Sequence, residues 1–259
     1  MSLIPMFTWV GGKRNEIKKF IQHVPTDIDT YLEPFVGGGA MYFHMNHTKN
    51  VINDVHTELI DFYQSIKNDE INEIHNFMSD QDFDQVSYFK VRDDMEINSK
   101  LDNAKRFYYL RKTCFRGMLR YDKKGKFNVC HNHKGDISFK DLQNKNYVDL
   151  LKNTTILNGD FEDIFKNYND PKNFMFLDPP YDCKISSYGY SKFEKAEHEK
   201  LAAIFKMTSI RCLMIIGKTD FISNLYSGYI VEEYDKRYDF SNIHKKNNSA
   251  IHLIIKNYN

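Results

Sequence analysis

The sequence predicts an α/β protein with a mostly parallel sheet that helices cover on both faces, and with one long insert. Short apolar runs alternate with turns and helix-like stretches over 30–65 and again over 153–218. Each of the first four runs ends in glycines or in an acid, and ligands of open α/β sheets bind beyond the carboxyl ends of strands. Between the two regions, roughly ninety residues do not alternate, far more than a crossover of a dozen or so needs.

The first two strands are expected near residues 31 and 51. The segment TYLEPFVGGGAMYF places glycines 37–39 after the first strand, where the backbone can approach a ligand closely and direct amide N–H groups at it. The segment NVINDVHTELIDFY ends the second strand at Asp54, before an apolar helix. An acid at this point binds ribose hydroxyls in nucleotide-binding folds.

The third and fourth strands also end in chemically informative residues. TTILNGDF ends with Asp160 and Phe161, and NFMFLDPPYDCK is an apolar run that stops at Asp178 and two prolines before Tyr181. Prolines can neither continue a strand ladder nor enter a helix interior. An acid between a buried strand and a double proline has little packing purpose, so Asp178 is the strongest catalytic candidate. The segment RCLMIIGKT predicts a further buried strand.

Composition is ordinary for a globular protein, with 259 residues of which 41% are apolar and 27% are charged. No apolar run approaches the ~20 residues of a membrane span, and the N-terminus has no signal-peptide pattern. We therefore expect a cytoplasmic or nucleoid-associated protein or, if the source is viral, one in the host cytoplasm or virus factory. The four cysteines have no paired spacing, and Cys130, His131 and His133 lack a second ligand pair at zinc-site spacing, so we predict free thiols and no metal.

The insert has a strong local charge that the formal net charge of +1 conceals. Between Lys105 and Lys126 there are nine basic residues and one acid, with five phenylalanine and tyrosine rings among them and a sixth, Phe127, directly after. Such a run can be a solvated helix face. Basic side chains mixed with flat rings are also what a surface needs to follow phosphates and contact bases.

Taken together, the motifs resemble one family in their order along almost the whole chain. FTWVGGKRNEIKKFI is similar to an N-terminal motif, EPFVGGGAMYF to a glycine-rich cofactor loop, NDVHTELIDFYQ to a ribose-binding segment, NGDF to a cofactor-adenine contact and DPPY to a catalytic loop. FRGMLRYDKKGKFNV, within the insert, is similar to a target-recognition segment. The chain thus resembles the Dam-type, D12-class (alpha group) DNA adenine-N6 methyltransferases.

The resemblance implies a Rossmann-like, class I S-adenosylmethionine-dependent methyltransferase sheet. Residues 1–64 and 153–259 would form the catalytic, cofactor-binding domain, and 65–152 a mainly helical target-recognition domain containing a β-hairpin. The implied reaction is methyl transfer from S-adenosylmethionine to the N6 amine of a flipped-out adenine in a short duplex DNA site, GATC or a related sequence. Double-stranded DNA would be the partner and a cognate restriction endonuclease a candidate partner, with no membrane and a monomer or weak dimer.

The resemblance also assigns roles to individual positions. Asp178 would accept a hydrogen bond from the amine, with help from the Pro179 carbonyl, while Tyr181 stacks on the purine and Trp9 and Lys13 close over the donor and the active site. The implied catalytic residues are Asp178, Pro179, Pro180 and Tyr181; the cofactor-binding residues are Trp9, Gly12, Lys13, Pro34, Phe35, Gly37, Gly39, Asp54, Asp160, Phe161 and Asp178; and the DNA-binding residues are Arg116, Met118, Arg120, Lys123, Lys124 and Asn128.

Other classes of protein fit less well. A nicotinamide-dependent dehydrogenase would need a spaced G-x-G-x-x-G, and a cytosine-C5 methyltransferase would need a Pro-Cys loop. Cytosine-N4 methyltransferases usually have serine where Asp178 stands. An adenine-N6 methyltransferase of structured RNA, and a non-catalytic DNA-binding regulator of the same fold, remain open alternatives.

Three departures from the family pattern concern the recognition sequence. Relatives that methylate GATC usually have lysine where Thr8 stands, and often have Asn-Gly-Leu-x-Arg where this chain has Arg-Gly-Met-Leu-Arg at 116–120. They also follow the hairpin with Pro-Phe-Gly, where this chain has Cys-His-Asn-His at 130–133. Arg120 keeps the side chain suited to a guanine O6 and N7.

Overall fold

The computed structural model describes residues 3–132, 137–182, 193–237 and 249–259. Of the residues considered above, His133 and Cys183 lie outside these ranges. Cys114, Cys130 and Cys212 are free thiols. None of the helices in the described ranges has the length and apolar character that a membrane span requires.

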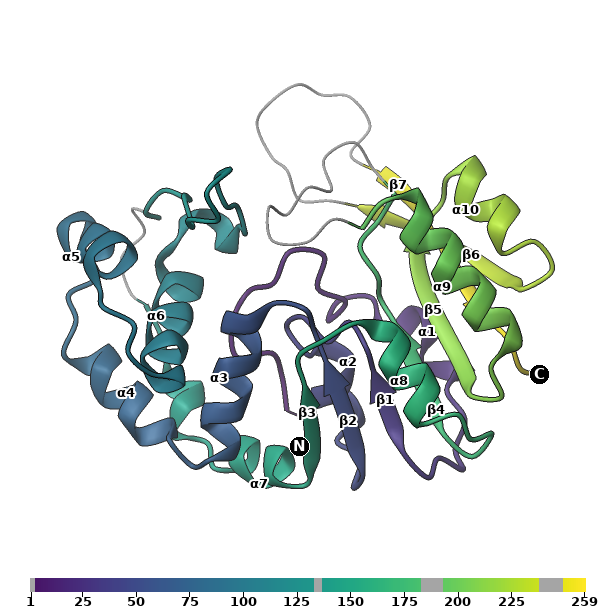
Figure 1. Ribbon diagram of the computed structural model, residues 1–259, viewed down its shortest axis with the longest axis horizontal. Coiled ribbons are helices and arrows are strands. Elements are labelled where there is room, and N and C mark those ends of the chain that lie inside the picture. Colours follow the sequence, from purple (N-terminus) through teal and green to yellow (C-terminus); the bar gives the residue numbers. More distant parts are fainter. Residues whose placement is uncertain (1–2, 133–136, 183–192, 238–248) are drawn as a thin grey trace.

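A mixed sheet forms the centre of the molecule (Figure 1). Its order is β3-β2-β1-β4-β5-β7-β6, with β1 to β5 parallel and β7 antiparallel between β5 and β6. This architecture confirms the predicted class I methyltransferase fold. The strands are β1 (Tyr31–Glu33), β2 (Asn50–Asn53), β3 (Thr154–Leu157), β4 (Phe174–Leu177), β5 (Arg211–Gly217), β6 (Ile230–Arg237) and β7 (Ser249–Lys256).

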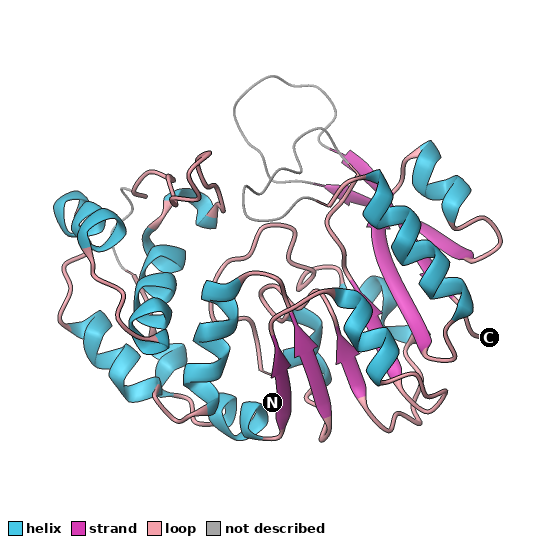
Figure 2. Ribbon diagram, viewed as in Figure 1, coloured by secondary structure: helices cyan, strands magenta, loops and turns pink. Residues whose placement is uncertain are grey.

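Helices flank the sheet on both faces (Figure 2). Those outside the insert are α1 (Ile17–Phe20), the 3-10 turn η1 (Ile21–His23), α2 (Ala40–Met45), α3 (Thr57–Lys67), α8 (Phe161–Asn167), α9 (Lys195–Met207) and α10 (Asp220–Leu225). Those of the insert are α4 (Ile71–Ser79), α5 (Gln85–Phe89), the π-turn η2 (Lys90–Asp94), α6 (Lys100–Thr113), the 3-10 turns η3 (Phe115–Gly117) and η4 (Lys140–Gln143), and α7 (Asn146–Lys152).

The strands are buried on both faces, which explains why their sequences are continuously apolar. In β4, Phe174 and Phe176 belong to the hydrophobic cluster on the side of α1, α2 and α3, whereas Met175 and Leu177 belong to the cluster under α8, α9 and α10. All four side chains are essentially inaccessible to solvent. Alternate residues of one short run therefore contribute to two separate layers.

The insert is mainly helical and lies at the β3 edge of the sheet, beside α3 (Figure 1). Its buried rings, among them Tyr88, Phe107 and Tyr108, belong to the same hydrophobic cluster as the α2 and α3 face of the sheet. Helix α3 runs across the predicted domain boundary at residue 64. The insert therefore shares a core with the sheet, and the boundary remains a prediction.

The expected β-hairpin lies in the insert and is short. Tyr121 and Phe127 form an antiparallel bridge, the Asn128 amide donates to the Arg120 carbonyl (3.0 Å), and Asp122 accepts from two amides of the turn. Gly125 takes a positive φ of 75° there. We call residues 119–129 the insert hairpin.

Candidate active site

A cavity of about 1000 Å³ opens at the carboxyl ends of the parallel strands. Residues that follow β1, β2, β4 and β5 all line it, as expected for the point where the strand order reverses. The predicted site residues that line it are Trp9, Gly12, Lys13, Phe35, Gly37, Asp54, Asp160, Phe161, Asp178, Pro179, Pro180 and Tyr181. Pro34 and Gly39 lie in the same loop but are not part of the lining, and neither are the six predicted DNA-binding residues.

Asp178 forms an ion pair with Lys13 at this edge. The Lys13 Nζ lies 2.7 Å from Asp178 Oδ1 and 2.8 Å from Oδ2, and it also donates to the Gly11 carbonyl (2.7 Å). The Lys13 side chain is only 3% exposed, whereas that of Asp178 is 21% exposed towards the cavity. The structure thus places a buried cation against the carboxylate that is open to an incoming group.

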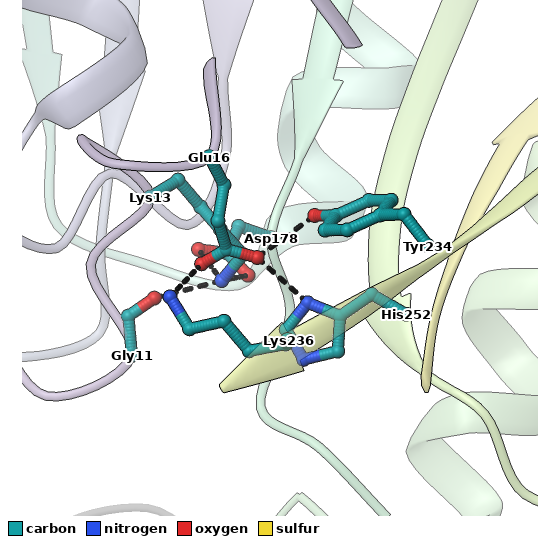
Figure 3. Close-up of polar contacts among 7 residues, drawn as sticks. All are labelled: Gly11, Lys13, Glu16, Asp178, Tyr234, Lys236 and His252. Carbon is teal, nitrogen blue, oxygen red and sulfur yellow. Dashed lines mark hydrogen bonds and ion pairs between the residues drawn. The ribbon is translucent and has the colours of Figure 1, made fainter. Parts of the chain in front are cut away.

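A second carboxylate, that of Glu16, lies beside this pair (Figure 3). Glu16 Oε2 accepts hydrogen bonds from Tyr234 Oη and His252 Nδ1, both at 2.8 Å, and Oε1 accepts one from Lys236 Nζ at 2.6 Å. Its side chain is 6% exposed. The Glu16 amide donates to the Lys13 carbonyl (2.7 Å), so this anchor on β6 and β7 also holds the segment that carries Lys13.

The two carboxyl groups differ in acidity because their surroundings differ. Burial raises the pKa of Asp178 above its ordinary value, although the Lys13 ammonium opposes the rise. Burial would also raise the pKa of Glu16, but its hydrogen bonds from His252, Lys236 and Tyr234 and the charge of Lys13 outweigh it and lower the pKa to about 2. Glu16 is therefore a fixed anion, and Asp178 a stronger proton acceptor.

The Tyr181 ring is held from several sides. His252 lies edge-on to it with ring centroids 5.2 Å apart, and Lys13 Nζ lies 5.0 Å from its centroid. A Cβ on Gly217, at the end of β5, would lie 3.1 Å from the ring. The absence of a side chain at Gly217 therefore lets the Tyr181 ring pack closely against the end of β5.

The glycine loop after β1 packs against Trp9. A Cβ on Gly37 would overlap the indole ring, and one on Gly38 would lie 2.7 Å from the Trp9 Cβ. Gly37 and Gly39 also have positive φ values, 46° and 68°, which favour glycine. Contact with the Trp9 side chain is thus one reason why these positions must be glycine. Close approach of a ligand in the cavity would be a second reason.

Asp54 is buried and holds the same loop. Its Oδ2 accepts the Gly37 amide and its Oδ1 accepts the His56 amide, both at 3.0 Å. Burial raises the pKa of Asp54 to about 6, and hydrogen bonds from the His56, Gly37 and Val55 amides oppose the rise. Each carboxylate oxygen can accept a further hydrogen bond.

Another acid, Glu33, lines the cavity close to Asp54 and Asp178. Burial raises the pKa of Glu33 well above its ordinary value, against a hydrogen bond of 2.5 Å from Tyr31 Oη. The surroundings of Glu33 therefore disfavour its ionised form.

Three aromatic rings form one wall of the cavity. Phe35 lies 5.4 Å from Phe161 and 5.7 Å from Phe193, and Phe161 lies 5.9 Å from Phe193, between centroids. Asp160 caps α8 by accepting the Glu162 amide (2.8 Å) and is largely exposed. Capping alone would account for an acid at Asp160.

The predicted DNA-binding residues are exposed or half-buried on and before the insert hairpin. The Arg120 guanidinium donates from Nε to Asn128 Oδ1 and from Nη2 to the Asn128 carbonyl, both at 2.7 Å. Arg116 has a left-handed backbone, with φ of 54°, and Lys123 and Lys124 at the turn are exposed.

The rest of the basic run divides by burial. Arg111 is buried and donates to the Gly117 (3.1 Å) and Met118 (2.8 Å) carbonyls, Lys112 pairs with Asp141, and Arg106 pairs with Glu58. These three side chains brace the insert, so only part of the run forms a solvated basic surface.

Several residues of the site were not singled out from the sequence. Glu16, Tyr234 and His252 meet only because β6 and β7 return beside the first residues, and no local pattern marks that contact. Phe193 precedes α9 and could have been found from the sequence, because it is an aromatic residue next to Glu194, the capping-box residue that begins the helix. Among the described residues, no cluster of three or more His, Cys, Asp or Glu side chains could hold a metal.

The fold and the site together define a methyltransferase with a carboxylate at the end of β4, and comparison with known proteins gives its class. The chain belongs to the family of D12 class N6 adenine-specific DNA methyltransferases, whose family model matches residues 9–245. It is thus an adenine-specific DNA methyltransferase.

Particular relatives come from viruses, archaea and bacteria. The chain is 46% identical to the type II methyltransferase M.CviBI of Paramecium bursaria Chlorella virus NC1A, over 98% of this chain and 99% of that protein. It is 34% identical to the type II methyltransferase M.MjaIII of Methanocaldococcus jannaschii, over the full length of both. It is 24% identical to the DNA adenine methylase of Haemophilus influenzae, over 86% of this chain and 83% of that protein.

Proposed function

We propose that the protein transfers a methyl group from S-adenosylmethionine to the N6 amine of an adenine that is flipped out of a short duplex DNA site, GATC or a related sequence. The observation that supports this most directly is the Asp178 carboxylate, open to the cavity and paired with the buried Lys13 ammonium. An atom inside a duplex cannot reach such a recessed carboxylate, so the base must leave the stack.

The residues of the cavity fit S-adenosylmethionine. The rings of Phe35, Phe161 and Phe193 offer an apolar wall for an adenine, and Asp54 offers free acceptor positions for ribose hydroxyls. Trp9 and the glycine loop would close the cavity near Gly37. When bound, the donor supplies an activated methyl group on a sulfonium centre.

Asp178 would act on the amine. The adenine N6 is a poor nucleophile because its lone pair is delocalised into the ring, and it gains positive charge as it takes the methyl group. A carboxylate that accepts a hydrogen bond from N6 stabilises that charge in the transition state. In the structure the Lys13 ammonium donates to both oxygens of Asp178, as the positively charged amine would do in the transition state. We expect the amine to replace Lys13 at one of these oxygens while Tyr181 stacks on the purine.

DNA would bind mainly to the insert, residues 65–152. The exposed Lys123 and Lys124 at the hairpin turn suit phosphate contacts, and Arg120 suits a guanine edge. Asn128 would hold the Arg120 guanidinium in position through the two hydrogen bonds described above. Arg116 and Met118 precede the hairpin in the sequence and are also exposed, Met118 to 38%, so they would be accessible to the same DNA.

Two of the departures from the family pattern, at Thr8 and at residues 116–120, lie in contact with each other. We expect this region to determine the recognition sequence. A Cβ on Gly117 would lie 2.9 Å from the Thr8 Cβ, so the N-terminal motif and the residues before the insert hairpin are in direct contact. Changes at Thr8 and Arg116 therefore alter one surface, and this surface would select between GATC and a related sequence.

Sequencing of the methylated product tests the proposal. The protein and S-adenosylmethionine are incubated with unmethylated genomic DNA, and N6-methyladenine is mapped; we expect methylation of one short motif. An equal amount of structured RNA is the parallel substrate. Methyl transfer to RNA alone, methylcytosine as the product, or tight DNA binding without any transfer would each overturn the proposal.

A further inference from the structure

A chain of partly buried hydrogen bonds joins the insert hairpin to the loop of Asp54. His56 Nε2 lies 2.7 Å from Tyr121 Oη, and Tyr121 Oη donates to Glu58 Oε2 at 2.7 Å. Glu58 Oε1 in turn pairs with Arg106 Nη1 at 3.0 Å. His56 is 3% exposed, Tyr121 is half-buried and the Glu58 side chain is 22% exposed, so these hydrogen bonds are partly shielded from water.

The direction of each hydrogen bond follows from the contacts. His56 Nδ1 accepts the Leu59 amide (3.2 Å) and caps α3, so it carries no proton in the neutral ring. Burial lowers the pKa of His56 to about 4, so the ring is neutral near pH 7 and its proton is on Nε2. His56 therefore donates to Tyr121, which donates to Glu58.

His56 also belongs to the proposed donor site. Its backbone amide donates to Asp54 Oδ1 (3.0 Å), and its ring lies edge-on to that of Trp9, 5.8 Å between centroids. Trp9 in turn packs against Gly37. A single residue thus contacts the carboxylate proposed for ribose through its backbone and the insert hairpin through its side chain.

The other end of this chain of hydrogen bonds lies next to Arg120, the residue proposed to contact a guanine edge. Tyr121 follows Arg120 directly and pairs with Phe127 across the hairpin. A shift of Tyr121 would therefore move the strand that presents Arg120.

We propose that His56 and Tyr121 are positioning residues that couple donor binding to DNA binding. The inference rests on the proposed function and adds to it that each ligand strengthens the binding of the other. A donor that orders the loop of Asp54 also orders the insert hairpin through His56, Tyr121 and Glu58. By linkage, DNA that orders the hairpin favours donor binding by the same factor.

A thermodynamic cycle measures this coupling. The dissociation constant of S-adenosylhomocysteine, which supports no turnover, is determined by calorimetry with and without a saturating duplex that contains the mapped site. We expect the duplex to tighten binding to the wild type by at least about fivefold. In Tyr121→Phe the ratio should fall to within about twofold of one, because the hydroxyl that joins His56 to Glu58 is gone.

A second variant and a control separate coupling from stability. His56→Asn keeps a side chain that can cap α3 but does not reach Tyr121, and it should lose the coupling too. Tyr88→Phe removes another buried hydroxyl that supports the hairpin, the one that donates to the Val129 carbonyl (2.8 Å), without a link to Asp54; it should keep the wild-type ratio.

The outcomes are distinguishable. A wild type with a ratio of one, a Tyr121→Phe or His56→Asn variant with the wild-type ratio, or a Tyr88→Phe variant that loses the coupling to the same extent would each overturn the inference while leaving methyl transfer intact. Failure of the proposed function would be different, since the wild type would then not methylate adenine in duplex DNA, whatever ratio the calorimetry gives.

Discussion

At Asp178, burial and the Lys13 ammonium act in opposite directions on one carboxyl group. The ion pair favours the charged form of the group, and burial makes it a stronger hydrogen-bond acceptor than an exposed aspartate. Truncation to alanine would leave the 3%-exposed Lys13 without its partner and would confuse stability with catalysis. The amide is therefore the better substitution.

Asp178→Asn should lower kcat by at least ~10²-fold on saturating duplex, because an amide cannot stabilise the charge that develops on N6 as a carboxylate does. Binding of S-adenosylhomocysteine should stay near normal. Asp182→Asn changes an acid on the same loop that accepts a hydrogen bond from Thr219 (3.1 Å) and should retain activity. A near-normal kcat for Asp178→Asn would remove this carboxylate from the chemistry.

Asp54 should make donor affinity depend on pH. Because burial raises the pKa of Asp54 to about 6, lowering the pH through that value protonates the carboxylate and weakens it as an acceptor for ribose hydroxyls. The dissociation constant of S-adenosylhomocysteine should rise roughly tenfold from pH 7 to pH 5, as expected for a single group of this pKa. Calorimetry checks this against Asp54→Asn, which should bind more weakly at pH 7 and show no inflection; the same inflection in both proteins would point to another group.

At the scale of the elements, the insert hairpin presents two kinds of basic residue. Arg120 is held by Asn128 on the strands, whereas Lys123 and Lys124 project from an exposed turn. A held guanidinium can read a base edge in a defined geometry, and flexible ammonium groups act as point charges towards phosphates.

Arg120→Ala should therefore cost ~1–3 kcal/mol on the methylated site and much less on unrelated DNA. Neutralising Lys123 and Lys124 should weaken binding to all duplexes similarly and reduce the salt dependence by roughly one unit of slope per lost contact. The quantity to measure is the ratio of cognate to non-cognate methylation at fixed salt. An unchanged ratio in Arg120→Ala would make Arg120 a phosphate contact and move recognition to Arg116 or to residues 130–134.

At the scale of the whole molecule, Glu16 joins the beginning of the chain to its end. The residues it binds, Tyr234, Lys236 and His252, follow it by 218, 220 and 236 positions. This contact fixes the N-terminal segment that carries Lys13 beside Asp178 (Figure 3).

Glu16→Gln should lower the free energy of unfolding at pH 7 by up to about 3 kcal/mol, since the pKa of Glu16 falls from 4.5 to about 2 on folding. A lowered pKa stabilises the folded state fully above about pH 4.5, and this contribution is lost as the pH falls towards 2. Urea unfolding at several pH values should show the difference narrowing in that window. Glu162→Gln, in a more exposed ion pair with Lys166 and Lys200, is the control and should lower the stability much less, because solvent screens such pairs. Equal losses would contradict the anchoring role of Glu16.

Much of the fold and of the site could be predicted because the signals are local. The five parallel strands were expected near their observed positions, since buried strands read as continuous apolar runs bounded by turn residues. Because the carboxyl ends of parallel strands meet at one edge, the loops of Gly37, Asp54, Asp160 and Asp178 could be expected to converge on one cavity, as they do.

Other features could not be predicted, because they depend on contacts between distant parts of the chain. The antiparallel β6 and β7 were not expected, and with them came Glu16, Tyr234 and His252. In the sequence, the basic residues between Lys105 and Lys126 cannot be told apart by their degree of burial. In the structure, Arg111 is buried and donates hydrogen bonds within the insert, whereas Lys123 and Lys124 are exposed.

The sequence by itself therefore determined the chemistry available to this protein: an acid after a buried strand, prolines that end that strand, glycines after the first strand, and a basic, aromatic insert. Only the tertiary structure decided which groups act on one another, such as Lys13 on Asp178 across 165 positions and His56 on Tyr121 across 65. The physical reason is that secondary structure follows from periodicity over a few residues, whereas the pKa of a carboxyl group depends on charges within a few ångströms in space, which strand order and packing bring together.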